Sequence, residues 1–517
     1  MLGFRLGFRR TPVNHPDPAL PRRLPLAREV TVVGGGIAGV AAALVLAERG
    51  AKVALLEANH ELGGRVSAWT DTLADGTRFE MERGFHAFFR QYYNLRALIR
   101  RIDPTLARLT PVTDYPLLGP DGAVESFAGL PKVPIVNLIS LIRRSSSMRL
   151  RDALRVDNTL GQAMMAYDPV ATYAKYDHLS AREFLDRLGF PPRARQMLFD
   201  VFSHSFFNPE AELSAAELMM MFHFYFIGNP EGIVFDVLDG PFSTRLWQPL
   251  QRHLEQLGVH LELGAAVSHV TRDGQRVQVH TATRTHSGDA VILAPHLPGL
   301  QRIAAASTEL DPAWRARVAA HTVTSAFAVW RLWLDRPSAP GRAPFVGTTG
   351  LGLLDNISLY HLFEDESRDW AARTGGSVVE LHAYALPPGL ADAEIQADML
   401  ATLHHLYPET RNARVLEQRF LVRQDCPAFR PGESPMRLRV TTPEPALLLA
   451  GDFVHTDFPT ALMERAAATG MPAGRVSSSA SKGARWGPGT ARCYRCGRTG
   501  LVNRPARQAL CLGALTV

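Results

Sequence analysis

The chain has 517 residues, 46% of them hydrophobic and 21% charged, so it is long enough for a large core and about two lobes. The net charge of +6 comes from the ends: residues 1–28 carry six arginines and one aspartate, and residues 476–517 carry seven basic groups and no acid. About −6 therefore remains on the body, which argues against a nucleic-acid partner. Four cysteines exclude a disulfide framework and favour a reducing, cytoplasmic setting.

The first 27 residues are rich in proline and arginine, and we expect them to form a flexible basic leader. A strand is predicted at 30–33, and Gly34, Gly36 and Gly39 follow it in a G-x-G-x-x-G pattern. An alanine-rich helix and a second strand come next, and that strand ends in Glu57. A membrane-spanning helix over this uncharged stretch is disfavoured, because three glycines would weaken it.

This order of elements is typical of a dinucleotide site. Gly34 permits the tight turn, Gly36 lets a pyrophosphate approach the backbone, and Gly39 lets the helix pack closely on the strand. The N-terminus of the helix presents free N–H groups to the phosphates. Glu57 is expected to accept hydrogen bonds from an adenosine ribose.

The pair Gly64 and Arg65 follows soon after Glu57. An arginine on a glycine turn beside the nucleotide would neutralise pyrophosphate charge. Residues 87–240 are mostly helical in pattern and rich in large apolar side chains. Within them, residues 131–155 combine apolar positions with five arginines, which suits a helix lying in a membrane interface; a surface helix packed on the core is the alternative.

The hydrophobic period changes to that of strands after residue 258. Strands are predicted at 259–263, 267–271, 276–281, 289–293, 322–334, 377–386 and 446–450. Gly451 and Asp452 come directly after the last of these. A carboxylate at this sheet edge suits the ribityl hydroxyls of a flavin, although Asp452 could instead cap the next helix. That helix is predicted to run over 459–470 and to stop at Gly470, which would weaken flavin retention.

Residues 476–517 are atypical, and we expect a disordered tail. Their composition is what a shifted reading frame in a GC-rich gene would give, and 52 arginines against four lysines fit such a gene. The alternative is a zinc or redox module on Cys493 and Cys496. A single C-x-x-C without a nearby histidine makes a poor zinc site, so we predict no metal.

With these motifs, the chain resembles the FAD-dependent amine oxidase and phytoene desaturase superfamily from residue 30 to about 473. The resemblance implies an α/β fold, with a Rossmann-like FAD-binding domain and a mixed α+β substrate domain. The implied parts are FAD-binding segments at 28–90, 241–300 and 441–475, a mostly helical substrate- and membrane-facing segment at 91–240, and a substrate-domain sheet at 301–440. It also implies that the backbone of Val267 pairs with adenine and that Met463 lies near the isoalloxazine.

Three segments, 82–104, 221–237 and 451–470, are similar to the isorenieratene-type β-carotene desaturase/methyltransferases. This resemblance implies FAD-dependent desaturation of the β-ionone ring with a 1,2-methyl migration, giving an aromatic end ring. It implies a lipophilic carotenoid substrate and a cytoplasmic protein peripheral to a membrane surface, and it leaves the electron acceptor open. The alternatives are another FAD-dependent isoprenoid desaturase, an amine oxidase of the same fold, or an inactive flavin-binding scaffold at a membrane.

His86 is the best candidate for a catalytic polar group, because 84–86 follows the loop that lies near the flavin in that superfamily. The alternative is a histidine bonded to the backbone. Aromatic faces could stabilise a carbocation on the ring, although core packing explains the same residues. The candidates are Phe88, Phe89, Tyr92, Phe222, Phe224 and Tyr225.

Overall fold

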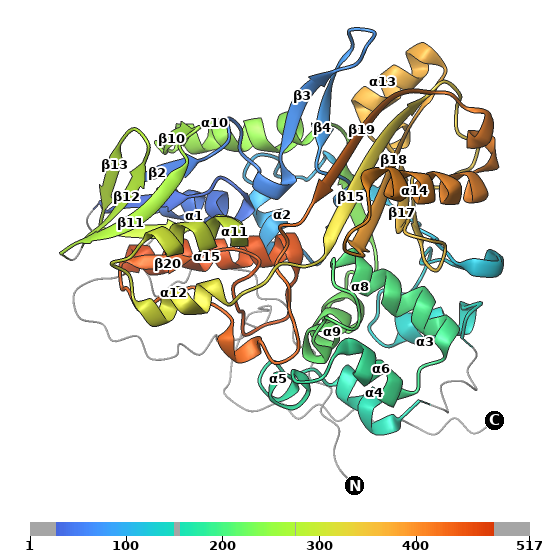
Figure 1. Ribbon diagram of the computed structural model, residues 1–517, viewed down its shortest axis with the longest axis horizontal. Coiled ribbons are helices and arrows are strands. Elements are labelled where there is room, and N and C mark those ends of the chain that lie inside the picture. The colour runs from blue at the N-terminus through green and yellow to red at the C-terminus, as the bar shows by residue number, and fades with distance from the viewer. Residues whose placement is uncertain (1–26, 149–155, 275, 480–517) are drawn as a thin grey trace, which may run out of the picture. The chain divides into compact units, whose positions relative to one another are not determined.

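The computed structural model describes residues 27–148, 156–274 and 276–479, which are built around two large sheets (Figure 1). The first sheet has five strands, and every neighbouring pair in it is parallel. Its order is β10 (His260–Leu263), β2 (Lys52–Glu57), β1 (Glu29–Val33), β14 (Ala290–Leu293) and β20 (Leu447–Leu449). Segments far apart in the chain thus build one sheet, and the predicted α/β fold class is confirmed.

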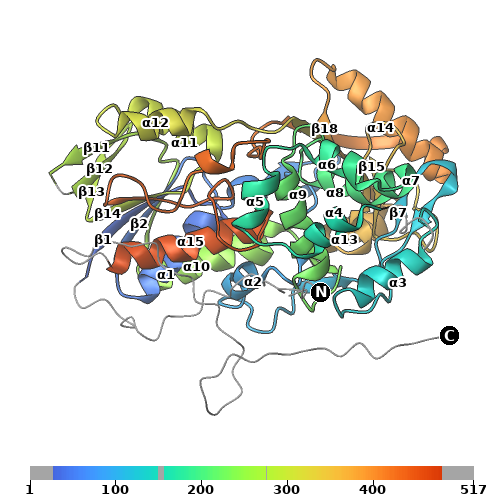
Figure 2. The ribbon, with the colours of Figure 1, turned by 90° about the horizontal axis from the view of Figure 1, so that it is seen from below.

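Helices cover one face of this sheet, and a small antiparallel sheet together with two more helices covers the other (Figure 2). Val30 and Val32 of β1 pack with α1 (Ile37–Glu48), whereas Val33 points to the opposite core, as strand alternation requires. Further elements complete the two layers: α10 (Gln248–Gln256), β11 (Val267–Asp273), β12 (Arg276–Thr281), β13 (Thr285–Gly288), α11 (Leu297–Ala306) and α12 (Pro312–Ala319).

The last helix corrects a prediction. Instead of stopping at Gly470, α15 runs from Leu462 to Ser479 and includes Pro472. A Cβ added at Gly470 would lie 2.2 Å from the Ala38 carbonyl oxygen of α1, and one at Gly474 would lie 2.8 Å from the Ala42 carbonyl oxygen. The two glycines, one turn apart, let α15 lie against α1, so tertiary packing outweighs the weak helix propensity of Gly and Pro. The expected loss of flavin retention therefore has no basis in the helix.

The second sheet has seven strands and forms one wall of a cavity that the parallel sheet also lines. Its order is β19 (Val415–Arg423), β15 (Ala326–Leu334), β18 (Ser377–Leu386), β17 (Asn356–Leu359), β16 (Phe345–Thr348), β7 (Leu117–Leu118) and β8 (Val124–Glu125). Helix α14 (Asp392–Leu406) buries Ile395, Met399 and Leu403 against one face of it. Helix α13 (Asp365–Thr374) lies beside β18.

Residues 87–240 are less uniformly helical than predicted, because short strands stand between the helices. The helices are α2 (Tyr93–Ile99), α3 (Val136–Arg144), α4 (Asn158–Met165), α5 (Ala171–Tyr176), α6 (Ala181–Leu188), α7 (Pro192–Arg195), α8 (Val201–Ser205) and α9 (Ala215–Phe222). Strands β5 (Phe88–Phe89), β9 (Phe235–Leu238) and β6 (Leu109–Val112) form a three-stranded sheet. The hairpin of β3 (Ala68–Thr72) and β4 (Arg78–Glu82) precedes them.

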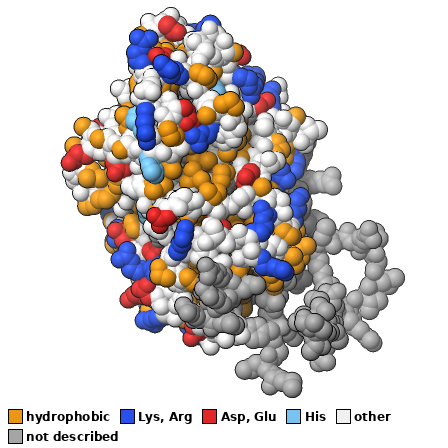
Figure 3. Space-filling model, turned by 90° about the vertical axis from the view of Figure 1, so that its right-hand side faces the viewer, with side chains coloured by type: hydrophobic (Ala, Val, Ile, Leu, Met, Phe, Trp, Pro, Cys, Tyr) orange, Lys and Arg blue, Asp and Glu red, His pale blue; other side chains and the backbone are white. Residues whose placement is uncertain are grey.

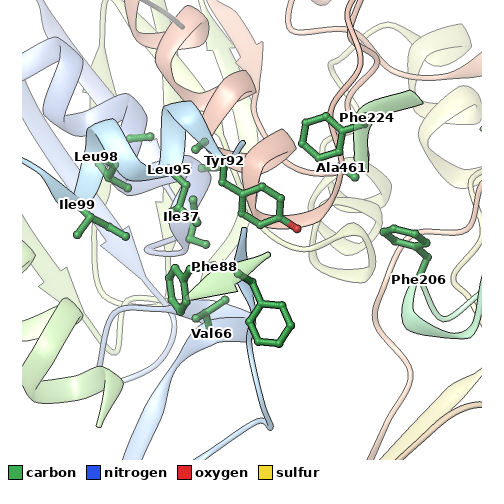
Figure 4. Packing of buried hydrophobic residues seen from close by; sticks show 14 of the residues in the cluster. Ile37, Val66, Phe88, Tyr92, Leu95, Leu98, Ile99, Phe206, Phe224 and Ala461 are labelled. Carbon is green, nitrogen blue, oxygen red and sulfur yellow. The ribbon is translucent and has the colours of Figure 1, made fainter. Parts of the chain in front are cut away.

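A shared aromatic core joins these parts. Figure 4 shows the Tyr92 ring between Ile37 of α1 on one side and Phe224 and Ala461 on the other. The rings of Tyr92 and Phe224 stack at 6.0 Å, and the Tyr92 hydroxyl bonds to that of Tyr225 at 2.8 Å. Aromatic contact and burial of this kind hold the helical segment against the parallel sheet.

Several predicted features fall on residues that the structure does not describe. They are most of the leader at 1–27, residues 149–155 of the amphipathic segment, and the tail from 480 with Cys493 and Cys496. Within 27–148, 156–274 and 276–479, no helix combines the length and apolarity that crossing a bilayer requires. In the same ranges, no group of His, Cys, Asp or Glu side chains is arranged to hold a metal ion.

Candidate active site

One cavity of about 640 Å³ lies between the parallel sheet and the seven-stranded sheet. Ten of the eleven predicted site residues line it, although they come from five separate parts of the chain. They are Gly34, Gly36, Glu57, Gly64, Arg65, His86, Val267, Gly451, Asp452 and Met463. Gly39 lies one turn inside α1 and does not reach the cavity.

Glycine is favoured at the three motif positions for three different structural reasons. Gly34 has a φ of +104°, and a Cβ there would lie 2.6 Å from the Ala294 carbonyl oxygen. A Cβ at Gly39 would lie 1.8 Å from the Gly34 carbonyl oxygen, so only glycine lets α1 approach β1. At Gly36, the N-cap of α1, the nearest non-neighbouring atom would be 3.8 Å away, so this position opens onto the cavity.

The N-terminus of α1 suits an anionic ligand. Gly36 has no side chain to cap the helix, and the first turn contains no acidic residue. Free N–H groups at such a helix end attract phosphate. Glu57 lies beside it at the end of β2, where its carboxylate accepts hydrogen bonds from the amides of Gly35 (2.6 Å) and Asn59 (2.9 Å). The turn and the acid are thus held in one rigid unit.

Arg65 and Asp452 form an ion pair of 2.6 Å at the cavity, although 387 positions separate them in the chain. Their neighbours fix them in place. Arg65 lies in a short turn, Gly64–Val66, and the Trp247 indole donates to the Val66 carbonyl at 2.6 Å. The Gly451 amide donates to the Thr469 hydroxyl at 3.0 Å. This bond ties the turn that carries Asp452 to α15, the helix that also carries Met463.

The residues present fit a dinucleotide that carries a flavin. A concave cradle without Cβ atoms faces the cavity at Gly36, and a cationic side chain and two carboxylates surround it. Val267 lines the same cavity at the start of β11, and Met463 lines it near the start of α15. These residues could hold an adenine, a pyrophosphate and a ribityl chain in that order along the parallel sheet.

His86 lies at the cavity wall and is bonded to the backbone, as in the alternative interpretation. Its Nδ1 is 2.7 Å from the Gly84 carbonyl oxygen, which can only accept, so Nδ1 carries the proton and Nε2 is an acceptor. Burial lowers the pKa of His86 to about 4, so the ring is neutral at physiological pH. Neutral His86 can accept a hydrogen bond in the cavity, but it holds a proton weakly.

Aromatic rings line the part of the cavity that faces the second sheet. Phe85 stacks on Phe345 at 4.6 Å, and Phe89 lies 4.9 Å from Tyr225. Of the six predicted aromatic candidates, Phe89, Tyr92 and Tyr225 line this cavity. Phe88 and Phe224 are core residues, and Phe222 lines a neighbouring cavity.

Seven further polar residues, which the sequence did not predict, line the cavity. Asn356, His382 and Tyr384 belong to strands of the second sheet, and Arg83, Asp355, Asp425 and Cys426 lie just outside strands. Arg83 pairs with Asp425 at 2.7 Å, and burial raises the pKa of the Cys426 thiol to about 11, so the thiol is protonated. One signal was available for two of them: Glu380, His382 and Tyr384 alternate along an otherwise apolar strand, which is unusual for an interior strand.

Comparisons with known proteins agree with this geometry. Residues 37–475 match the model of the flavin containing amine oxidoreductase family. The chain is 46% identical to a carotenoid phi-ring synthase of Streptomyces griseus, over 93% of both chains, and 28% identical to one of Chlorobaculum tepidum, over 89% of this chain and 90% of that one. The solved structure of a cyclohexylamine oxidase from Brevibacterium oxydans superposes with a TM-score of 0.64 at 15% identity, covering 88% of this chain and 99% of that one, and shows the shared fold.

The family match covers most of the chain, and the similarity to the phi-ring synthase is close and nearly full-length. The predicted superfamily and the predicted FAD cofactor are confirmed. The chain therefore belongs to the flavin containing amine oxidoreductases and is an FAD-dependent oxidoreductase, in the part of the family that includes carotenoid phi-ring synthases.

Proposed function

We propose that the protein desaturates the β-ionone ring of β-carotene and moves one geminal methyl group to the adjacent carbon, so that the end ring becomes aromatic. The observation that carries the proposal is the near full-length likeness to carotenoid phi-ring synthases. The cavity supports it, because a glycine-rich nucleotide cradle and a compartment of aromatic rings share one space. An apolar ring is the natural occupant of that compartment.

The reaction balances over two rounds. A β-ionone ring has one ring double bond and an aromatic ring has three, so four hydrogens leave as two hydrides and two protons. Bound FAD supplies the hydride acceptor, with two electrons taken in each round. In one round, a methyl group moves with its bonding electrons to the neighbouring cationic carbon, and a proton is then lost to form the C=C bond. The protein's own residues hold the ring, exclude water and stabilise the cation.

The aromatic compartment suits that cation. The ring of Phe235 lies 5.4 Å from that of Phe89, 5.6 Å from that of Phe345 and 4.8 Å from that of Tyr115. The negative faces of aromatic rings attract a cation that water does not reach. These rings can therefore stabilise the cation without a carboxylate in contact with the carotenoid ring.

Pigment analysis tests the proposal. When the protein is expressed in a bacterium that makes β-carotene, we expect a new carotenoid that is four hydrogens lighter for each converted ring. The proton NMR spectrum of this carotenoid should show signals of hydrogens on an aromatic ring. A matched culture that expresses the Gly36→Ala variant should keep β-carotene. Unchanged β-carotene in both cultures, or a longer polyene with its end rings intact, would contradict the proposal.

A second cavity gives room for the rest of a long hydrocarbon. It measures about 450 Å³ and is almost wholly apolar, with Leu138 and Leu141 of α3 in its wall. Phe206 lines both this cavity and the first, so the two are neighbours. The polyene of a carotenoid that enters the first cavity at one end can continue toward α3.

The outer side of α3 is the proposed membrane contact. Val133, Val136 and Ile139 are 60%, 46% and 48% exposed, and Lys132 and Arg143 flank them. This helix is at the right of Figure 1, on the side that faces the viewer in Figure 3, where hydrophobic side chains gather among basic and acidic ones. Exposed apolar residues beside cations suit the headgroup region of an anionic bilayer.

The double variant Val136→Asp, Ile139→Asp should bind vesicles of phosphatidylcholine and phosphatidylglycerol at least about tenfold more weakly. Each apolar side chain contributes about 1 kcal/mol or more when it is buried in lipid, and the aspartates repel the anionic surface. Co-sedimentation measures the binding. The matched control is Val415→Asp, Leu416→Asp on β19, where the side chains are 38% and 40% exposed. Equal binding by the wild-type protein and the α3 variant would refute the contact.

A further inference from the structure

Three polar side chains follow one another along the cavity face of β18. Glu380, His382 and Tyr384 stand at alternate positions, while Leu381 and Ala383 point into the core on the other face. Glu380 and His382 are 0% and 2% exposed. His382 and Tyr384 both line the cavity of the nucleotide cradle. Charged and polar groups buried at this depth need a structural or chemical reason.

Hydrogen bonds join them into one chain. The Asn356 amide donates to the Tyr384 hydroxyl at 2.9 Å, so the hydroxyl proton is directed to His382 Nδ1, 2.6 Å away. His382 Nε2 lies 2.8 Å from Glu380, and Arg331 donates to the other oxygen of Glu380 at 2.8 Å. The buried pair with Arg331 keeps Glu380 ionised, so Nε2 carries the histidine proton. The Phe85 amide N–H also points at Nε2, from 3.2 Å, but a protonated Nε2 cannot accept this hydrogen bond, and the shorter bond to the ionised Glu380 decides where the proton lies.

The backbone of β18 is irregular at Tyr384. A β-bulge places Tyr384 and Ala385 opposite the single residue Phe327 of β15, and Ala385 has a φ of +49°. Bulges redirect side chains near active sites, and positive φ at a non-glycine residue is strained. The Tyr384 ring lies 5.0 Å from that of Phe207, another non-glycine residue with positive φ (60°). The fold therefore holds this hydroxyl in the cavity at some cost.

We propose that Tyr384 takes the proton released by the ring and passes its own hydroxyl proton to His382, whose imidazolium Glu380 then stabilises. This step rests on the proposed function. The C–H bond next to the cation breaks, its electron pair becomes the new C=C bond, and the proton goes to the Tyr384 oxygen. The Tyr384 O–H proton moves to Nδ1 of His382, and it later returns to water. Tyr384 is then a catalytic residue, and Glu380 is a positioning residue that acts through His382.

His86 is another base in the wall of the same cavity. Its neighbour is a backbone carbonyl, and its low pKa makes its imidazolium unstable. His382 has instead a carboxylate 2.8 Å from its Nε2, which stabilises the positive charge that proton transfer creates. The relay thus uses the histidine that the cavity provides with a counter-ion.

Tyr384→Phe separates proton transfer from oxidation. Mixed anaerobically with β-carotene, the FAD-bound variant should bleach its flavin within about threefold of the wild-type rate. When an added quinone then reoxidises the flavin for the second round, the variant should give about 10²-fold less aromatic product than the wild type. The control Tyr407→Phe makes the same change in the second sheet's core, where the hydroxyl has no partner among the described residues. Equal aromatic product from wild type and Tyr384→Phe overturns the relay alone. No aromatic product from wild type overturns the proposed function.

A second measurement needs no turnover and covers a variant that fails to fold. Nitrogen-15 spectra of the wild-type holoprotein with labelled histidine should show His382 with a protonated Nε2 and an unprotonated, hydrogen-bonded Nδ1. The Nδ1 signal should shift in Tyr384→Phe and stay in place in Tyr407→Phe. The opposite tautomer would contradict the relay, since Nδ1 could not then accept the tyrosine proton.

Discussion

Gly36→Ala should yield a folded protein that does not hold FAD. A Cβ at this position meets no non-neighbouring protein atom closer than 3.8 Å, and the Gly36 φ of −77° suits any residue. The new methyl would project where the pyrophosphate has to approach the backbone. A steric cost of about 3 kcal/mol corresponds to roughly 100-fold weaker binding. The ratio of flavin to protein absorbance measures the occupancy, and thermal unfolding of the FAD-free protein measures the fold.

Gly39→Ala is the matched comparison, because it adds the same methyl three residues further along. Here the methyl would lie 1.8 Å from the Gly34 carbonyl oxygen, inside the packing of α1 on β1. We expect the free energy of unfolding of this variant to fall by about 1–3 kcal/mol or more, and we expect the variant to lose its flavin as well. If Gly36→Ala retained FAD, or if the two variants unfolded alike, the proposed position of the pyrophosphate would be wrong.

Glu217→Gln should destabilise the protein by about 3–5 kcal/mol. Glu217 in α9 accepts hydrogen bonds from Arg465 of α15 at 2.5 Å and from Arg437 at 3.0 Å. All three are nearly fully buried, and both guanidiniums lie over the Phe429 ring. The variant would leave two buried cations without a counter-charge. Urea unfolding measures the loss, and Glu212→Gln is the control, since its pair with Arg430 is exposed and contributes less than about 1 kcal/mol.

The ion pairs of Glu217 with Arg465 and Arg437 predict that the stability of the protein depends on pH. Burial alone would raise the pKa of Glu217, but the charges of Arg465 and Arg437 outweigh it and lower the pKa to about 2. Because the pKa is lower in the folded state than the unfolded value of 4.5, the stabilisation is present above about pH 5. It is lost as pH falls from about 5 to about 2. The difference in unfolding free energy between wild type and Glu217→Gln should therefore shrink in acid; a constant difference would contradict the ionised pair.

Three consecutive residues of α15, Met463, Glu464 and Arg465, contact three different parts of the molecule. Met463 lines the nucleotide cavity, and Glu464 accepts hydrogen bonds from the amides of Asn94 and Leu95, both at 2.9 Å. Arg465 reaches Glu217 of α9. Burial raises the pKa of Glu464 to about 8, so this carboxyl group is held by its hydrogen bonds rather than by a cation. One helix turn thus joins the FAD-binding sheet to the helical segment.

The nucleotide cradle was predictable because its signals are local. The turn, helix and strand from β1 to β2 follow one another directly in the chain, and Gly39 makes room for the carbonyl oxygen of Gly34, only five positions earlier. Arg65 and Asp452 were recognisable as separate turns, but their ion pair was not, because 387 positions separate them. Family resemblance supplied what spacing could not: that two distant turns serve one cofactor.

The errors have the opposite cause. The local sequence predicts a helix end at Gly470, Pro472 and Gly474, because glycine and proline have weak helix propensity. In the structure the helix continues, and both glycines pack against α1. His382 and Tyr384 were missed because no motif surrounds them, and a bulge against β15 brings Tyr384 to the cavity. Propensity and spacing describe neighbours in the chain, and these residues are defined by neighbours in space.

The central claim is oxidation of the cyclic end group at the FAD site. Its most direct measurement is anaerobic mixing of the purified FAD-bound protein with β-carotene in detergent. Flavin absorbance is recorded first, and product mass is recorded after an added quinone has reoxidised the flavin for the second round. The account predicts that the flavin is reduced by β-carotene, that an acyclic carotene leaves it oxidised, and that the product carries an aromatic ring with a migrated methyl group. Reduction by the acyclic carotene alone, or oxidised flavin with both, would contradict the account.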